Sequence, residues 1–157
     1  MTTHQTTSLC EGTITIEVLG NPKGQPRPRA VAFAGRARMY DDPKHPVHGW
    51  RDLVSLAAQD KRPEQPIVGP IAVEMHFRMP RPASHYTKKG IVKPNAAEWC
   101  ETKPDCDNLA KAVLDVLTNS QFWRDDSQVV HVTVIKVYAT DRPAGASIQI
   151  RAIGGGQ

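Results

Sequence analysis

The chain has 157 residues, of which 39% are hydrophobic and 23% are charged, and this length fits one domain with its own core. It carries 20 lysines and arginines against 16 aspartates and glutamates, a net charge of +4 and a pI of about 9.1. No apolar run approaches the ~20 residues of a membrane span, and the first residues lack the pattern of a signal peptide. We therefore expect a cytoplasmic protein that does not bind membranes.

The distribution of apolar and polar residues predicts a single folded domain between two tails. Residues 1–11 are polar and are expected to be disordered, 12–153 form the domain, and 154–157 form a C-terminal tail. The elements expected in chain order are a strand at 13–19, a short hairpin made of 30–33 and 37–40, a helix at 46–61, a strand at 71–77, a helix at 107–118, and strands at 128–139 and 146–153.

This order of elements predicts an α+β fold, in which two main helices pack on one face of a small mixed β-sheet. The last two strands are separated only by a turn at 141–145, so we expect them to pair with each other in antiparallel fashion. Leu109, Val113, Val116 and Leu117 recur at helical spacing and should form the buried stripe of the second helix.

The positive charge is concentrated in two blocks that contain no acid. The first block lies between residues 21 and 40 and the second between 75 and 97. Such blocks are often only a solvated face, but two of them in one small domain favour a polyanionic partner, with nucleic acid as the leading candidate. The candidate DNA-binding residues are Lys23, Arg27, Arg29, Arg36, Arg38, Lys88, Lys89 and Lys103.

Two acidic clusters flank the second predicted helix. Asp105 and Asp107 precede or begin it, Asp125 and Asp126 follow it, and Lys111 lies one turn after Asp107. Each residue also has a structural explanation: aspartates cap helices and form turns, and Lys111 could make a surface ion pair with Asp107. However, a cap needs one carboxylate, and two adjacent like charges repel each other unless a cation lies between them.

A divalent cation would relieve that repulsion, because clustered carboxylates are the hard oxygen ligands that Mg²⁺ or Mn²⁺ prefers. Asp105 and Asp107 could converge at the start of the helix. Asp126 could complete the site if the strand at 128–139 packs beside that helix. The metal would then activate water or polarise a phosphoryl oxygen, and Lys111 would stabilise charge in the transition state.

The acidic segments resemble a known family. The segment Asp105-Cys-Asp-Asn-Leu-Ala-Lys111, followed by Trp123-Arg-Asp-Asp-Ser-Gln-Val-Val130, is similar to the pattern D-x-D-N-x-x-K and D-D-x-Q-V of the RusA family of Holliday-junction resolvases. The proline- and arginine-containing segment at 20–29 also resembles the basic loop of that family. These enzymes are common in bacteria, their phages and their prophages.

The resemblance implies a RusA-like fold and a homodimeric, Mg²⁺-dependent endonuclease that nicks two strands of a four-way DNA junction symmetrically, in recombination and repair. It also implies that Asp105, Asp107 and Asp126 are the metal-binding catalytic aspartates and that Lys111 is the active-site lysine. Asp125 matches a position of less certain role. Two alternatives remain open at this point: a non-catalytic nucleic-acid-binding protein, and a nuclease for other branched or single-stranded DNA.

Overall fold

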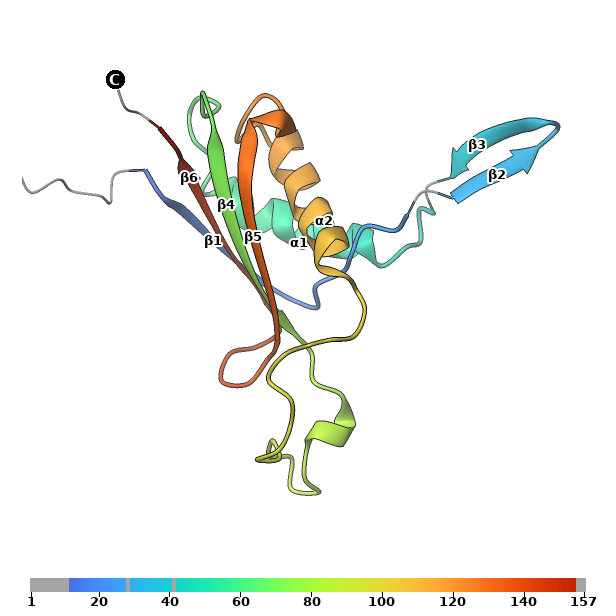
Figure 1. The fold of residues 1–157 in the computed structure, drawn as a ribbon, viewed down its shortest axis with the longest axis vertical. Helices are drawn as coiled ribbons and strands as arrows, with labels where there is room; N and C mark the ends of the chain where they lie inside the picture. The colour runs from blue at the N-terminus through green and yellow to red at the C-terminus, as the bar shows by residue number, and fades with distance from the viewer. Residues whose placement is uncertain (1–11, 28, 41, 155–157) are drawn as a thin grey trace, which may run out of the picture.

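The computed structural model describes residues 12–27, 29–40 and 42–154, and of the two predicted tails only Gly154 is among them. Its body is a four-stranded sheet with two helices on one face (Figure 1). The sheet contains β1 (Ile14–Leu19), β6 (Gly145–Ala152), β4 (Ile71–Met79) and β5 (Val129–Tyr138), in that spatial order. The helices are α1 (Val47–Gln59) and α2 (Cys106–Asn119). The α+β fold predicted from the sequence is confirmed.

A separate hairpin is formed by β2 (Arg29–Phe33) and β3 (Arg36–Tyr40), as the sequence predicts. Figure 1 draws it extending away from the sheet and the two helices. The structure describes the backbone of this hairpin but not its side chains, so the contacts of Arg29, Arg36 and Arg38 lie outside the described part of the molecule.

The core lies between the sheet and the helices because each element presents one apolar face there. The predicted stripe of α2 is buried, and Trp50, Val54 and Ala58 of α1 are buried beside it. β4 is buried at seven of nine positions, because it is a central strand with β6 on one side and β5 on the other. This packing fixes where both ends of α2 lie relative to the sheet.

The predicted pairing of the last two strands is wrong. β6 pairs with β1 and with β4, both in antiparallel fashion, and β5 pairs with the other edge of β4 in parallel. β4 therefore lies between β5 and β6. The physical reason is burial: Ala146, Ile148 and Ile150 are fully buried on β6, whereas Val130 and Val132 of β5 are exposed and suit an edge strand.

The outer edge of β5 is only partly covered. At its C-terminal end, Cys100 N–H donates to Lys136 O at 3.3 Å and Tyr138 N–H donates to Glu98 O at 2.8 Å. Within the described ranges, no strand pairs with the outer edge of residues 129–135. Val130 is 63% exposed and Val132 43% exposed on this stretch. An open apolar edge of this kind is a template for pairing with another chain.

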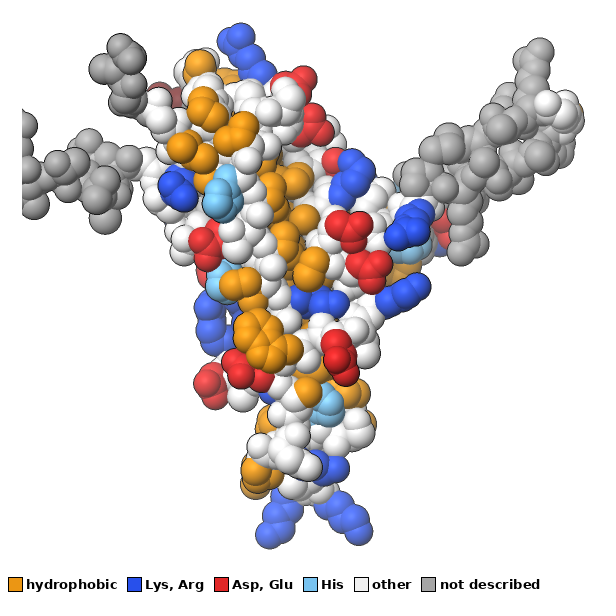
Figure 2. All heavy atoms as spheres, viewed as in Figure 1, with side chains coloured by type: hydrophobic (Ala, Val, Ile, Leu, Met, Phe, Trp, Pro, Cys, Tyr) orange, Lys and Arg blue, Asp and Glu red, His pale blue; other side chains and the backbone are white. Residues whose placement is uncertain are grey.

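The second basic block continues past β4 into a projection over residues 80–99, at the lower end of the molecule in Figure 1. Arg81 holds its base: Nε donates to Ala139 O at 2.8 Å, Nη1 to Ala97 O at 2.7 Å and Nη2 to Thr140 Oγ1 at 2.8 Å. A short 3₁₀ turn, η1 (Ala83–His85), follows. Figure 2 shows Lys or Arg side chains at the far tip of this projection.

No helix in the described ranges has both the length and the apolar character that crossing a membrane would require.

Candidate active site

The N-terminus of α2 presents two exposed aspartates. Asp105 is the N-cap residue, with extended backbone, and its carbonyl accepts the N–H of Leu109 at 3.0 Å. Its side chain makes no capping hydrogen bond, and Asp107 lies in the first helical turn. The capping explanation therefore does not account for the Asp105 carboxylate, which remains available for a ligand at the positive end of the helix dipole.

Lys111 lies on the same helix but does not pair with Asp107. Its Nζ is 3.2 Å from Oδ1 of Asp115, one turn further along α2. The lysine side chain is 62% exposed. Exposed pairs of this spacing contribute only about 0.3–0.5 kcal/mol, so Lys111 can exchange Asp115 for an incoming phosphate at little cost.

A lysine from β5 holds the turn that leads into α2. Lys136 Nζ donates to Thr102 O at 2.5 Å and to Pro104 O at 2.8 Å. Burial alone would raise the pKa of the neighbouring Cys100 thiol, but hydrogen bonds with Thr102 and Tyr138 and the charge of Lys136 leave that pKa below its usual value. The sequence analysis did not identify Lys136 as a residue that positions the site. The pattern that could have indicated it is a single lysine within an otherwise apolar strand.

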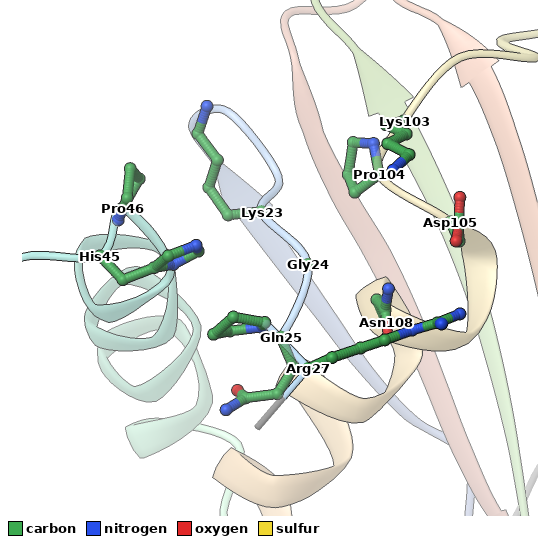
Figure 3. A pocket seen from close by; sticks show the side chains of 11 residues that line it. Lys23, Gly24, Gln25, Arg27, His45, Pro46, Lys103, Pro104, Asp105 and Asn108 are labelled. Atoms are coloured by element: carbon green, nitrogen blue, oxygen red, sulfur yellow. The ribbon is translucent and has the colours of Figure 1, made fainter. Parts of the chain in front are cut away.

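A cleft of about 760 Å³ opens beside Asp105. Figure 3 shows its walls: the loop after β1, the segment leading into α1, and the start of α2. Its lining residues are Lys23, Gly24, Gln25, Pro26, Arg27, His45, Pro46, Lys103, Pro104, Asp105 and Asn108. The cleft thus brings together three predicted DNA-binding cations and one predicted catalytic aspartate. Sequence reasoning did not identify His45 or Asn108 as parts of it.

The loop after β1 is attached to α2 by close packing. Gln25 N–H donates to Asn108 O at 2.9 Å. A Cβ at Gly24 would lie 3.0 Å from Cβ of both Asn108 and Pro104, so this position leaves little room for a side chain. Glycine therefore lets the basic loop approach α2 closely enough to place Lys23 and Arg27 in the same cleft as Asp105.

The second acidic cluster has a clear structural component. Asp125 caps a short 3₁₀ turn, η2 (Asp126–Gln128), by accepting the Ser127 N–H at 2.8 Å. The Gln128 side chain completes a capping box by accepting the Arg124 and Asp125 N–H groups at 2.9 and 3.2 Å. Asp125, whose role the sequence left uncertain, is therefore a capping residue.

We predict that Asp125→Ala lowers the melting temperature by a few degrees at neutral pH. Hydrogen bonds from Ser127 hold the pKa of Asp125 below its usual value. A depressed folded-state pKa means that the stabilisation is present above the unfolded-state pKa and is lost as pH falls through the folded-state pKa. Thermal unfolding of the wild type and the variant is measured from neutral to strongly acidic pH. The difference between their melting temperatures should shrink in acid. A constant difference would contradict this role.

Asp126 lies at the other end of α2 from Asp105. It begins η2, the turn that leads into β5. The first residue of β5 pairs with the start of β4, whereas Lys136 at the far end of β5 contacts Pro104. Seven strand residues separate these points, or about 23 Å. Across residues 12–27, 29–40 and 42–154, no three His, Cys, Asp or Glu side chains gather closely enough to hold a metal. The three-aspartate metal site stays a prediction, and one chain alone does not assemble it.

Lys88 and Lys89, two of the predicted DNA-binding residues, do not line the cleft. Lys88 and Lys89 occupy the turn at the tip of the 80–99 projection, closed by Gly90 N–H donating to Thr87 O at 2.9 Å. Lys93, in contrast, donates from Nζ to Ser84 O at 2.8 Å within the projection. Arg81 and Lys93 therefore maintain the shape of the projection, and the two tip lysines are exposed.

Comparison with known proteins gives a family match and several relatives. The sequence model of the family "Endodeoxyribonuclease RusA" matches residues 20–151. YqaN of Bacillus subtilis (strain 168), an uncharacterized protein, is 35% identical over 136 residues, which cover 82% of this chain and 89% of YqaN.

Crossover junction endodeoxyribonuclease RusA of Escherichia coli (strain K12) is 53% identical over 36 residues, which cover 23% of this chain and 30% of that protein. The enzyme of the same name from Enterobacteria phage 82 matches over an equal length with the same identity. The match over residues 20–151 includes all residues that line the cleft and most of the sheet, and the chain belongs to the endodeoxyribonuclease RusA family.

Proposed function

We propose that this protein is a divalent-metal-dependent endodeoxyribonuclease that resolves four-way DNA junctions in recombination and repair, in the cytoplasm of a bacterium. The observation that carries the proposal is the cleft itself: an exposed aspartate without a capping bond lies among Lys23, Arg27 and Lys103. Cations around an acidic centre suit a DNA phosphate that must approach a metal-binding carboxylate. The family match and the name of its E. coli and phage relatives support the same activity.

The residues at the start of α2 fit a hard divalent cation. Mg²⁺ is usually held by one or two carboxylates together with substrate phosphates and water, and Mn²⁺ accepts similar ligands. Asp105 and Asp107 supply such oxygens within one helical turn. When bound, the ion would supply Lewis-acid polarisation and an activated water. Lys111, one turn further, would place a positive charge near the leaving phosphate oxygens.

Asp126 can join this site if the protein is a homodimer paired through β5. Val132 is the middle residue of the uncovered stretch of that edge, 129–135. Antiparallel pairing around a twofold axis at Val132 would set Gln128 of the partner subunit opposite Lys136. Since Lys136 contacts Pro104, Asp126 of the partner subunit would arrive beside Asp105. The same pairing would cover Val130 and Val132.

One assay tests the activity directly. The protein is incubated with a four-way junction and with a linear duplex of matched sequence, each with and without Mg²⁺. We expect paired nicks at the junction only when Mg²⁺ is present. Cutting of single-stranded or three-way DNA in preference to the junction would assign a different branched substrate, and binding without any cutting would assign a non-catalytic role.

The tip of the 80–99 projection should contribute affinity but no chemistry. We predict that replacing Lys88 and Lys89 together with alanine weakens junction binding and lowers the slope of log K against log salt by up to about 1.8, at 0.9 per lost phosphate contact. Turnover at saturating DNA should be unchanged. Lys61→Ala, at the far end of α1, is the matched control. An unchanged salt slope in the double variant would place the projection off the DNA path.

A further inference from the structure

A histidine on the wall of the cleft opposite Asp105 has no assigned role. His45 lies just before α1, and Figure 3 shows its ring extending from that wall toward the loop that carries Lys23. We propose that His45 donates a hydrogen bond from Nε2 to a DNA phosphate that flanks the one being cut. This inference rests on the proposed function, because it assumes that the cleft holds a DNA strand.

The first step of the argument is the state of the ring. Val47 N–H, at the start of α1, donates to His45 Nδ1 at 3.1 Å. The N-cap residue of α1 is Pro46, which makes no side-chain capping bond, so His45 satisfies a helix-start N–H in its place. Because an N–H can only donate, Nδ1 must be the acceptor, and the neutral ring carries its proton on Nε2.

The second step is the position of that proton. Within the described part of the chain, the His45 side chain makes one hydrogen bond, the one with Val47 N–H. Its Nε2–H therefore has no protein acceptor there. His48, one turn later, differs: its Nε2 donates to Asp42 O at 2.9 Å. Of the two histidines at the start of α1, only His45 lines the cleft with an unused donor.

The third step is what such a donor can bind. Three other cleft residues, Lys23, Arg27 and Lys103, also offer only donors, so the ligand that fits is rich in acceptors and negatively charged. The volume of about 760 Å³ is within the range of clefts that hold drug-sized molecules, which suits a short stretch of a single backbone but not a whole duplex. Asp105 on the opposite wall would repel a bare phosphate, so the phosphate at His45 is a neighbouring one.

Two substitutions separate the capping role of His45 from DNA binding. His45→Asn keeps an acceptor where Nδ1 lies but removes the donor at Nε2. His45→Gln places an amide nitrogen near the Nε2 position but loses the capping acceptor. His76→Asn is the control, because His76 lies on β4 outside the cleft and pairs with Glu74 at 2.7 Å. Melting temperature, affinity with EDTA present, and turnover at saturating DNA with Mg²⁺ are measured for each.

We expect His45→Asn to melt like the wild type but to bind DNA about tenfold more weakly, the effect of losing one hydrogen bond to a charged group. Its turnover at saturating DNA should stay near the wild-type value, because the flanking phosphate takes no part in bond cleavage. His45→Gln should melt at a lower temperature and bind close to the wild-type affinity. Wild-type affinity in His45→Asn would overturn the proposal, as would equally weak binding in both variants.

Affinity is measured on a four-way junction, a linear duplex and a single strand, so that the two proposals can fail separately. If the wild type binds duplex as tightly as junction, the junction-resolving function fails. The role of His45 is then judged on the duplex. If the wild type binds none of the three, both proposals are overturned.

Discussion

Asp105→Asn should reduce cleavage of a four-way junction by roughly 10²–10³-fold or more, while junction binding stays intact or becomes tighter. The carboxylate is exposed at the start of α2 and makes no capping bond, so the amide removes a negative charge without removing a structural contact. Affinity measured with EDTA should rise if anything, because one charge fewer opposes the phosphates. We expect the same result for Asp107→Asn, the other carboxylate of the first turn.

The matched control is Asp60→Asn, which changes an exposed aspartate at the other end of a helix, the C-cap of α1. It should cleave, bind and melt like the wild type. The measurements are the single-turnover cleavage rate, the dissociation constant with EDTA and the melting temperature. If Asp105→Asn melts early and the folded fraction cleaves at the wild-type rate, Asp105 is a structural residue and the active site lies elsewhere.

The features of this molecule that sequence predicts well are those governed by local periodicity. α2 spans Cys106–Asn119, close to the predicted 107–118, and its predicted apolar stripe is buried because the 3.6-residue repeat alone decides which face meets the sheet. The motif residues Asp105 and Asp107 could be found because they lie within three positions of one another. The sequence also predicts that Lys23, Arg27 and Lys103 bind DNA. That role stays a prediction, but the structure brings the three side chains together beside Asp105.

The features that sequence misses depend on contacts between distant segments. β5 and β6 are consecutive, yet β4 lies between them, because the choice of neighbour depends on which strand must be buried on both sides. The distance between Asp126 and Asp105 follows from the parallel register of β4 and β5, which no local pattern encodes. The position of His45 likewise depends on how α1 and the loop after β1 meet at α2.

The separation of Asp126 from Asp105 leads to the second large effect. If Asp126 acts from the partner subunit, two inactive variants should restore each other. In a heterodimer of Asp105→Asn and Asp126→Asn chains, one site carries both substitutions. The other site contains Asp105 and Asp107 of one chain and Asp126 of the partner subunit, all unchanged. Two differently tagged chains are co-expressed, and the heterodimer is isolated through both tags.

We expect each homodimer to be inactive and the heterodimer to cut with about half the wild-type number of sites, since a twofold dimer has two. With one working site it should nick one strand of a junction per binding event instead of two. The control is a heterodimer of Asp105→Asn and Asp107→Asn chains. Both of these aspartates lie at the start of α2 of the same chain, so each site then carries one substitution and no activity should return.

The contrast between the two heterodimers decides the architecture of the site. Recovery in the first and not in the second requires that Asp126 reaches the cleft from another copy, as pairing of the β5 edge about Val132 would allow. Recovery in neither, with both heterodimers folded and bound to the junction, would mean that the three aspartates are not shared in this way. In that case Asp126 would act within its own chain or have no part in catalysis. A Val132→Lys substitution tests the dimer interface itself. A charge at the centre of the proposed interface should yield monomers in sedimentation and abolish paired nicking.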